Sequence, residues 1–295
     1  MKITDKIELY NCDNMELMAK IKDESINIIL TDPPYLYLKN QKLEREFDEI
    51  KFFSECKRVL KKDCFIVLFG RGVSFYRWNC ILNDLGFTFK EEIVWNKSYS
   101  SSPVLPISRV HETISIFSKG NGVINKVKVP YIEQKGFNID SVISDIKRIS
   151  SSLKNEKALE HLLHYVENDF RIDFEKKRTS NFNATLQTEA LGNQCVTTLQ
   201  SITEGMKEKS IINIIREHYK SIHPTQKPVR LLERLLLLVK KSDYDLILDP
   251  FGGSLSTMEA VYNLGLNGIS CEIDKEYYDK GIERVKNHVS QLKLF

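Results

Sequence analysis

A glycine turn close to the C-terminus is the feature that most constrains the fold. Residues 245–248 read as a short strand that is followed by Gly252 and Gly253, and the next expected strand, residues 267–271, ends at the acidic Glu272. A strand, a glycine turn, a helix and a second strand with an acidic end are the usual start of a nucleotide-binding α/β sheet. Only 23 residues follow Glu272. The remaining strands must therefore come from the N-terminal part of the chain.

The N-terminal part provides such strands, because apolar runs alternate there with segments of helical spacing. Residues 64–70 are a continuous apolar run closed by a glycine, which is typical of a strand buried on both faces of a parallel sheet. We predict an α/β fold with a Rossmann-like sheet that is mostly parallel, seven-stranded and permuted. The other expected strands are 27–31, 87–95, 113–117, 245–248 and 267–271, and the expected helices are 47–61, 74–85, 229–240, 255–264 and 275–292.

The middle of the chain interrupts this alternation. The segment 120–222 is polar, contains three consecutive serines at 150–152, and has only weakly marked helices such as 156–166. We interpret it as a module inserted into the α/β domain. The predicted domains are thus 1–119 together with 223–295, and the insertion 120–222.

Net charge, cysteine spacing and the length of the apolar stretches limit which binding sites and partners we expect. The net charge of +3 is too small to identify a nucleic-acid partner, although a local basic groove can coexist with it. The six cysteines form no Cys-x-x-Cys pair, so we expect reduced, mostly buried thiols and no metal site. The longest apolar stretch, near 231–239, is short and flanked by charges, and no apolar core follows the first lysines. We therefore expect a cytoplasmic protein with no membrane partner.

Four residues at the end of the 27–31 run, Asp32, Pro33, Pro34 and Tyr35, are the candidate catalytic site. The prolines end the strand and leave their carbonyls free to accept hydrogen bonds. Asp32 adds a carboxylate acceptor, and the ring of Tyr35 offers a stacking surface of the kind that contributes roughly 1–3 kcal/mol per base. Such a site suits a planar base with an exocyclic amine, flipped out of a duplex and aligned mainly by positioning. A bare Asp-Pro-Pro is more often only a turn, but its place after a β-branched run favours the functional interpretation.

With these segments in this order, the chain resembles the amino-methylating DNA methyltransferases of the β arrangement. In that group Asp-Pro-Pro-Tyr precedes the target-recognition region, and the cofactor glycine motif follows it. The resemblance covers roughly two-thirds of the chain. It implies S-adenosyl-L-methionine as cofactor, double-stranded DNA as partner, and base flipping with direct methyl transfer to N6 of adenine, because aspartate before Pro-Pro-Tyr usually accompanies adenine. It also raises the expectation of a homodimer and of a cognate restriction endonuclease.

The resemblance also assigns cofactor roles residue by residue. The segment 11–13 matches the part beside the cofactor adenine, 223–228 the part before the cofactor strand, 249–254 the cofactor loop, and Glu272 the acid on the ribose hydroxyls. The segment 109–112 resembles a late strand motif, in which we expect His111 and Glu112 to be structural. The candidate cofactor-binding residues are Cys12, Asp13, Asp32, Thr225, Gln226, Lys227, Asp249, Pro250, Phe251, Gly252, Gly253, Ser254 and Glu272.

One residue of the cofactor loop departs from the family pattern. Where the family has Gly-Ser-Gly, this chain has Gly253, Ser254 and Leu255. We expect Leu255 to crowd a close approach to the backbone unless the loop is displaced. Binding should survive, because Gly252 and Gly253 keep the tight turn.

The insertion is the expected target-recognition region, and its clearest DNA-contact candidates are Lys176, Lys177 and Arg178. A solvated loop is an equally good interpretation of that basic run. The alternative functions are a cytosine-N4 methyltransferase and a catalytically impaired DNA-binding homologue. RNA or protein-amide methyltransferases commonly use Asn-Pro-Pro with the opposite motif order, and an oxidoreductase would leave 32–35 unexplained.

Overall fold

The structure is a computed structural model, and it describes residues 1–35, 45–98, 106–154, 159, 190–216 and 221–291. The chain divides into two compact units, Met1–Lys126 with Lys209–Phe295, and Val127–Glu208. The smaller unit is shorter than the segment 120–222 that the sequence suggests. The reason is that β9 (Ile211–Asn213) pairs in parallel with β5 and so belongs to the sheet of the larger unit.

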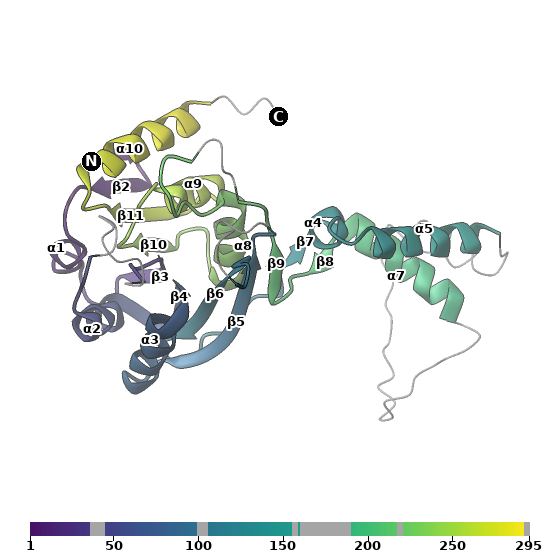
Figure 1. Cartoon of the computed structure of the whole chain (residues 1–295), viewed down its shortest axis with the longest axis horizontal. Coiled ribbons are helices and arrows are strands. Elements are labelled where there is room, and N and C mark those ends of the chain that lie inside the picture. Colours follow the sequence, from purple (N-terminus) through teal and green to yellow (C-terminus); the bar gives the residue numbers. More distant parts are fainter. Residues whose placement is uncertain (36–44, 99–105, 155–158, 160–189, 217–220, 292–295) are drawn as a thin grey trace. The chain divides into compact units, whose positions relative to one another are not determined.

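The described part of the larger unit contains one nine-stranded sheet (Figure 1). Six of these strands fall in the expected ranges, and β2 is a strand that no expected range covers. The sheet has more than the predicted seven strands because the short strands β1 and β9 extend its two edges. The strands are parallel from β2 to β4, and β6 runs antiparallel to both of its neighbours. In spatial order the strands are β1 (Lys2–Thr4), β2 (Ile7–Tyr10), β11 (Asn267–Cys271), β10 (Leu246–Asp249), β3 (Ile26–Thr31), β4 (Leu60–Gly70), β6 (His111–Ser118), β5 (Thr88–Asn96) and β9.

The permutation expected from the position of the glycine turn is confirmed. Leu248 of β10 lies beside Ile29 of β3, and Cys271 of β11 lies beside Tyr10 of β2. The two C-terminal strands are thus inserted between two N-terminal strands. Because all four are parallel, the segments that follow β3, β10 and β11 emerge at one edge of the sheet.

Helices cover both faces of this sheet. On one face, α1 (Asn14–Met18), α2 (Glu49–Val59) and α3 (Gly72–Asp84) pack with Ile29, Ile66 and Leu68 in a buried apolar core. On the other, α8 (Val229–Val239) packs on β3 and β4, and α9 (Ser256–Asn263) packs on β11 and on α10 (Lys275–Ser290). Strands buried on both faces explain the continuous apolar runs in the sequence.

The local sequence accounts for the ends of several helices. Asp48 accepts a hydrogen bond from the backbone N–H of Lys51 and so begins α2, and Asp274 accepts from Glu276 and Tyr277 at the start of α10. Aspartate is a favoured N-cap residue because its carboxylate can accept from these otherwise unpaired N–H groups. Helix α8 has seven buried residues out of eleven, so it is held by packing rather than by caps.

The smaller unit is built mainly from helices. Its described elements are α4 (Tyr131–Lys135), α5 (Ile139–Leu153), α7 (Ala190–Glu204) and a two-stranded ribbon, β7 (Lys128–Val129) with β8 (Met206–Lys207). A buried carboxylate ties α4 to α5: Asp145 accepts from Tyr131 at 2.7 Å and pairs with Lys135 and Arg148. Of the expected helix 156–166, all but residue 159 lies outside the described residues.

The structure also gives the state of the cysteines and the lengths of the helices, which concern disulfides, metal sites and membrane spans. All six cysteines are unpaired, and Cys56, Cys64, Cys195 and Cys271 are buried. Among the described residues, no group of three or more His, Cys, Asp or Glu side chains is arranged to hold a metal ion. In the same residues, no helix is both long and apolar enough to cross a membrane.

Candidate active site

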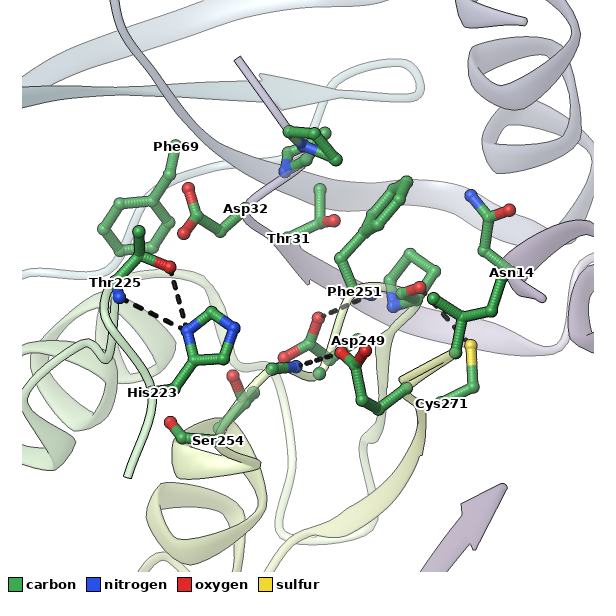
Figure 2. Close-up of a pocket in the computed structure, with 18 of the residues that line it drawn as sticks. Asn14, Thr31, Asp32, Phe69, His223, Thr225, Asp249, Phe251, Ser254 and Cys271 are labelled. Atoms are coloured by element: carbon green, nitrogen blue, oxygen red, sulfur yellow. Dashed lines mark hydrogen bonds between the residues drawn. The ribbon is translucent and has the colours of Figure 1, made fainter. Parts of the chain in front are cut away.

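A pocket lies where β3, β10 and β11 end, and it gathers segments from both ends of the chain. The four candidate catalytic residues 32–35 line it, and so do the candidate cofactor residues at 12–13, 225–227, 249–254 and 272. Figure 2 shows Asp32 beside Phe69 and Thr225, and Asp249 beside Phe251. The basic residues Lys176, Lys177 and Arg178 lie outside the described residues.

Hydrogen bonds from Tyr35 and from Ser74 of α3 fix the turn after β3. The hydroxyl of Tyr35 donates to Oδ1 of Asp32 at 2.5 Å, and the hydroxyl of Ser74 donates to the backbone carbonyl of Tyr35 at 2.7 Å. The ring of Tyr35 lies 6.1 Å from that of Trp78. Tyr35 thus both orients the carboxylate and presents an aromatic surface. The sequence suggested only the aromatic role.

A chain of alternating charges connects Asp32 to residues from three other segments. The ammonium of Lys227 pairs with Oδ2 of Asp32 and lies 3.2 Å from Oε2 of Glu112, whose Oε1 accepts from Lys97 at 3.0 Å. The same ammonium lies over the ring of Phe69, 5.1 Å from its centroid. Lys227 therefore contacts the candidate catalytic carboxylate, whereas the family resemblance assigns it to the cofactor.

Burial and charge act in opposite directions on these groups. Burial raises the pKa of Asp32, Lys227 opposes that shift, and Glu112 adds to it. Burial also disfavours ionisation of Glu112, but Lys227 and Lys97 outweigh it and lower the pKa of Glu112 to about 2. Glu112 is thus a charged residue of the pocket wall, although we expect it from sequence to be structural. The signal that could have identified it is its position at the start of β6, next to β4 in the sheet.

The glycine turn after β10 is tight and leaves no room for a side chain. The N–H of Gly252 donates to the carbonyl of Cys271 at 2.8 Å, and a Cβ on Gly252 would lie 2.5 Å from Oγ of Ser270. Gly253 has a φ of +53°, and its N–H donates to Oε2 of Glu272 at 2.8 Å. The expected tight turn is present, and its backbone fixes the position of the Glu272 carboxylate.

Leu255 does not crowd the pocket, so that expectation is wrong. It adopts the left-handed conformation, with a φ of +59°, at the start of α9, and its side chain is fully buried. The side chain packs against α10, where a Cβ on Gly281 would lie 2.8 Å from its Cδ1. The neighbouring Ser254 and Ser256 line the pocket instead. Gly281 provides the space for the leucine, at a backbone cost of about 1–2 kcal/mol for the left-handed residue.

Asp249 is the last residue of β10, and the described groups that donate hydrogen bonds to its carboxylate are uncharged. Its carboxylate accepts from the backbone N–H of Phe251 at 3.2 Å and from the side chain of Thr257. Burial raises the pKa of Asp249 to about 7, and the nearby Asp32 and Glu272 add to that shift. This carboxyl therefore titrates near neutral pH.

The pocket also contains residues that sequence reasoning missed. Asn14 follows the candidate segment 11–13, is 6% exposed and lines the pocket, and its Nδ2 has no hydrogen-bond partner among the described residues. Phe47 packs against Phe251 with ring centroids 5.4 Å apart. No sequence signal marked Phe47, whereas Asn14 lies directly after Asp13, which begins α1 by accepting from Met15 at 2.8 Å.

His223 and Thr225 line the pocket, with the ring of His223 beside the glycine turn. The ring of His223 packs edge-on against Tyr277 at 4.4 Å, and its Nδ1 accepts from the N–H of Thr225 at 3.3 Å. Burial lowers the pKa of His223 to about 4, with Lys227 adding to the shift. His223 is therefore a neutral packing residue at physiological pH, and it lies 3.5 Å from the position that a Cβ on Gly253 would take.

Comparison with known proteins decides the family. The sequence model of the DNA methylase family, which joins N6- and N4-type methyltransferases, matches residues 26–283. This chain belongs to that family. Its members depend on S-adenosylmethionine, and the matched range includes both turns that open into the pocket.

Curated relatives of this DNA methylase match over nearly its whole length. The DNA adenine methyltransferase YhdJ of Escherichia coli K12 is 28% identical over 297 aligned positions, which cover 96% of this chain and 84% of YhdJ. The type II methyltransferase M.HinfI of Haemophilus influenzae is 27% identical, covering 93% of this chain and 67% of the relative.

Solved structures with the same fold include a complex with S-adenosylmethionine and an enzyme described as cytosine-N4-specific. The M1.HpyAVI complex with S-adenosylmethionine has a TM-score of 0.54 and 18% identity, covering 94% of this chain and 99% of that one. The PvuII DNA methyltransferase, described as cytosine-N4-specific, has a TM-score of 0.58 and 16% identity, covering 97% and 93%. At these identities the likeness concerns the fold, which does not discriminate between the two bases.

Proposed function

We propose that this DNA methylase transfers a methyl group from S-adenosyl-L-methionine to N6 of an adenine flipped out of double-stranded DNA. The observation that carries the proposal is the shared pocket, in which Asp32 and the glycine turn line one cavity although they lie more than 200 residues apart. A donor site and an acceptor site must adjoin for direct transfer, since the reacting atoms have to approach to about 3–3.5 Å.

The residues of the pocket fit the cofactor. A turn without side chains at Gly252 allows close approach to the backbone, Glu272 offers acceptors for ribose hydroxyls, and the buried amide of Asn14 is a donor without a partner in the described chain. When bound, the cofactor supplies an activated methyl group on a cationic sulfur. Asp13, Glu272 and the 249–254 turn would hold its adenosine, and Asp249 adds a carboxylate to the same wall.

The proposed role of the 32–35 turn is to align the target amine. Asp32 and a proline carbonyl accept the two hydrogens of N6, which aims the nitrogen lone pair at the methyl group, and Tyr35 supports the base ring. The amine gains positive charge as the bond to carbon forms, and the Asp32 carboxylate stabilises that charge. No side-chain nucleophile is needed.

Adenine is favoured over cytosine N4 on two grounds. Position 32 is aspartate, as is usual for adenine-specific members, and the curated relative YhdJ is named as an adenine methyltransferase. A cytosine-N4 activity remains the alternative, since the family includes both types.

The remaining partners are predictions from the family. The segment order, with 32–35 before the smaller unit and the glycine turn after it, is the basis for the β arrangement, and the smaller unit is the proposed target reader, with Lys176, Lys177 and Arg178 as phosphate contacts. A homodimer, a cognate restriction endonuclease and a cytoplasmic location are predicted in the same way.

Nucleoside mass spectrometry of DNA from cells that express the protein tests the activity, and methylation-sensitive sequencing of the same DNA reports the recognised site. We expect N6-methyladenine at one short sequence, absent from cells that express the Asp32→Ala variant at the same level. Finding N4-methylcytosine instead would overturn the choice of base, and finding neither would overturn the proposed activity.

A further inference from the structure

The charged chain behind Asp32 joins three parts of the sequence that the family resemblance treats separately. Asp32 follows β3, Glu112 lies in β6, and Lys227 lies just before α8. The three side chains meet at the ammonium of Lys227, whose side chain is only 7% exposed. A buried ammonium of this kind is stable only when its charge is matched by acidic partners.

The contacts divide the two oxygens of Asp32 between two donors. Oδ1 accepts from the hydroxyl of Tyr35, and Oδ2 pairs with the ammonium of Lys227. Each carboxylate oxygen has a second lone pair, so both can still accept a hydrogen bond from a base. The donors therefore fix the plane of the carboxylate and leave it able to bind an amine.

The charges explain why a second acid is present. A cation beside Asp32 alone would cancel the negative charge that is required opposite a nitrogen that is becoming positive. Glu112 lies 3.2 Å from that cation and takes up its charge. Lys97 pairs with the other oxygen of Glu112 at 3.0 Å, farther from the pocket.

We propose that Lys227 and Glu112 are positioning residues for Asp32: the lysine holds the carboxylate ionised and oriented, and the glutamate balances the lysine so that Asp32 keeps its negative charge toward the target amine. The inference rests on the proposed function, because it concerns the same carboxylate. It assigns Lys227 to the transfer step and not to cofactor binding.

The groups that face this cluster come from every neighbouring element. Besides the three members, the ionisable groups are Tyr35 after β3, Lys97 just after β5, Asp249 at the end of β10 and His223 before α8, and Glu272 after β11 acts on Asp249. Asp249 titrates near pH 7 and would add its own effect to any pH profile. The test therefore compares variants with wild type over one pH range, so that this contribution is common to all.

Removing the lysine and removing the glutamate should shift the acidic limb of activity in opposite directions. In Lys227→Met, Asp32 loses its cation and protonates at higher pH. The midpoint of the acidic limb in the plot of kcat against pH should therefore move to higher pH, by about one pH unit or more. In Glu112→Gln, the lysine acts on Asp32 alone, so the limb moves down and the plateau kcat falls, because Asp32 is then more fully neutralised. The double variant should have a limb between the two and a plateau kcat above that of Glu112→Gln.

The experiment measures methyl transfer to duplex DNA from labelled cofactor at saturating concentrations between pH 5.5 and 9, with circular dichroism at each pH to restrict the data to folded protein. Lys227→Arg keeps the charge and should keep the limb near its wild-type position, even if its plateau is lower. Lys240→Met is the matched control, because Lys240 lies at the other end of α8 and its ion pair in the described part of the chain is with the exposed Asp243. Cofactor affinity, measured by calorimetry, should change less than about threefold in all of these variants.

Three outcomes have distinct meanings. Opposite shifts with unchanged cofactor affinity support the inference. The inference would be overturned by shifts in the same direction or by no shift. It would also be overturned if Lys227→Met lost cofactor affinity with kcat unchanged, because Lys227 would then be a cofactor-binding residue. If wild-type protein methylates neither adenine nor cytosine, the proposed function fails, and this inference fails with it.

Discussion

Two turns of this DNA methylase begin with the same dipeptide at neighbouring strand ends and yet differ in their electrostatics. Asp32 and Pro33 follow β3, Asp249 is the last residue of β10 and is followed by Pro250, and the two strands pair in parallel. Asp32 contacts the buried ammonium of Lys227, whereas Asp249 accepts only neutral donors, from Phe251 and Thr257, in the contacts that the structure describes. The ammonium of Lys227 opposes the upward shift that burial imposes on the pKa of Asp32, whereas burial raises the pKa of Asp249 to about 7.

The difference shows that the ionisation of a buried acid depends on the charged side chains that other segments of the chain place beside it. The apolar runs before the two aspartates are alike, so the local sequence does not distinguish the two environments. Lys227 arrives from the segment before α8 and reaches only one of them. We infer that one aspartate serves as a permanent acceptor for the target base, while the other responds to the positive charge of the cofactor.

The largest effect should come from exchanging the two acids for neutral residues. Asp32→Ala should lower kcat at least about 100- to 1000-fold, because the developing charge loses its stabilising anion. Asp249→Asn should lower kcat far less, and its effect should fall on the apparent KM for the cofactor. Methyl transfer into DNA and cofactor calorimetry measure the two quantities. Equal losses of kcat in both variants would break the distinction between the turns.

The second effect is a pH dependence of cofactor binding that belongs to Asp249. Its raised pKa means that the free protein holds a proton there below about pH 7, and the protonated form attracts the cationic cofactor less. The dissociation constant should therefore rise by up to about tenfold for each pH unit below 7 and level off above it. Calorimetry between pH 5.5 and 8.5 measures the slope, and the Asp249→Asn variant should flatten it. A slope that persists in the variant would assign the proton to another group.

The third effect is a loss of stability from changing the backbone of the glycine turn. Prolines restrict the backbone at 32–35, whereas glycines allow the tight turn at 249–254. Gly252→Ala places a Cβ 2.5 Å from Oγ of Ser270 and 2.6 Å from Cδ2 of Leu255, so the turn must move. We expect a loss of about 1–3 kcal/mol in the free energy of unfolding and weaker cofactor binding. Urea denaturation measures the first. Gly265→Ala is the control for a substitution without a clash, because no atom lies within 4 Å of its added Cβ; its φ of +67° means that it reports backbone strain alone.

The smallest effect on cofactor binding should follow from restoring the glycine that is usual in the family. Leu255→Gly relieves about 1–2 kcal/mol of backbone strain but removes a fully buried side chain, which is worth about 2–5 kcal/mol. The net result should be a loss of about 1–3 kcal/mol in stability with cofactor affinity unchanged. A tenfold gain in affinity would instead mean that the leucine does obstruct the pocket.

Much of the site could be read from sequence because short motifs carry their own geometry. Asp32 to Tyr35 and the 249–254 turn follow buried strands, and parallel strands end at one edge of a sheet, so their meeting in a pocket was predictable. The behaviour of Leu255 was not, because it depends on Gly281 of α10, which provides the space that the side chain fills. The boundary of the smaller unit was likewise misplaced, because β9 is three residues long and gains its place from pairing with β5.

The sequence by itself determined the class of sheet, the permutation and the two turns, since apolar periodicity, proline and glycine act locally. The tertiary structure decided which charges meet. Lys227 lies 195 positions from Asp32 in the chain, and Glu112 lies in a third segment, so no local pattern predicts their contact. Electrostatic interactions depend on distance and burial, and both are fixed only when the strands and α8 have assembled.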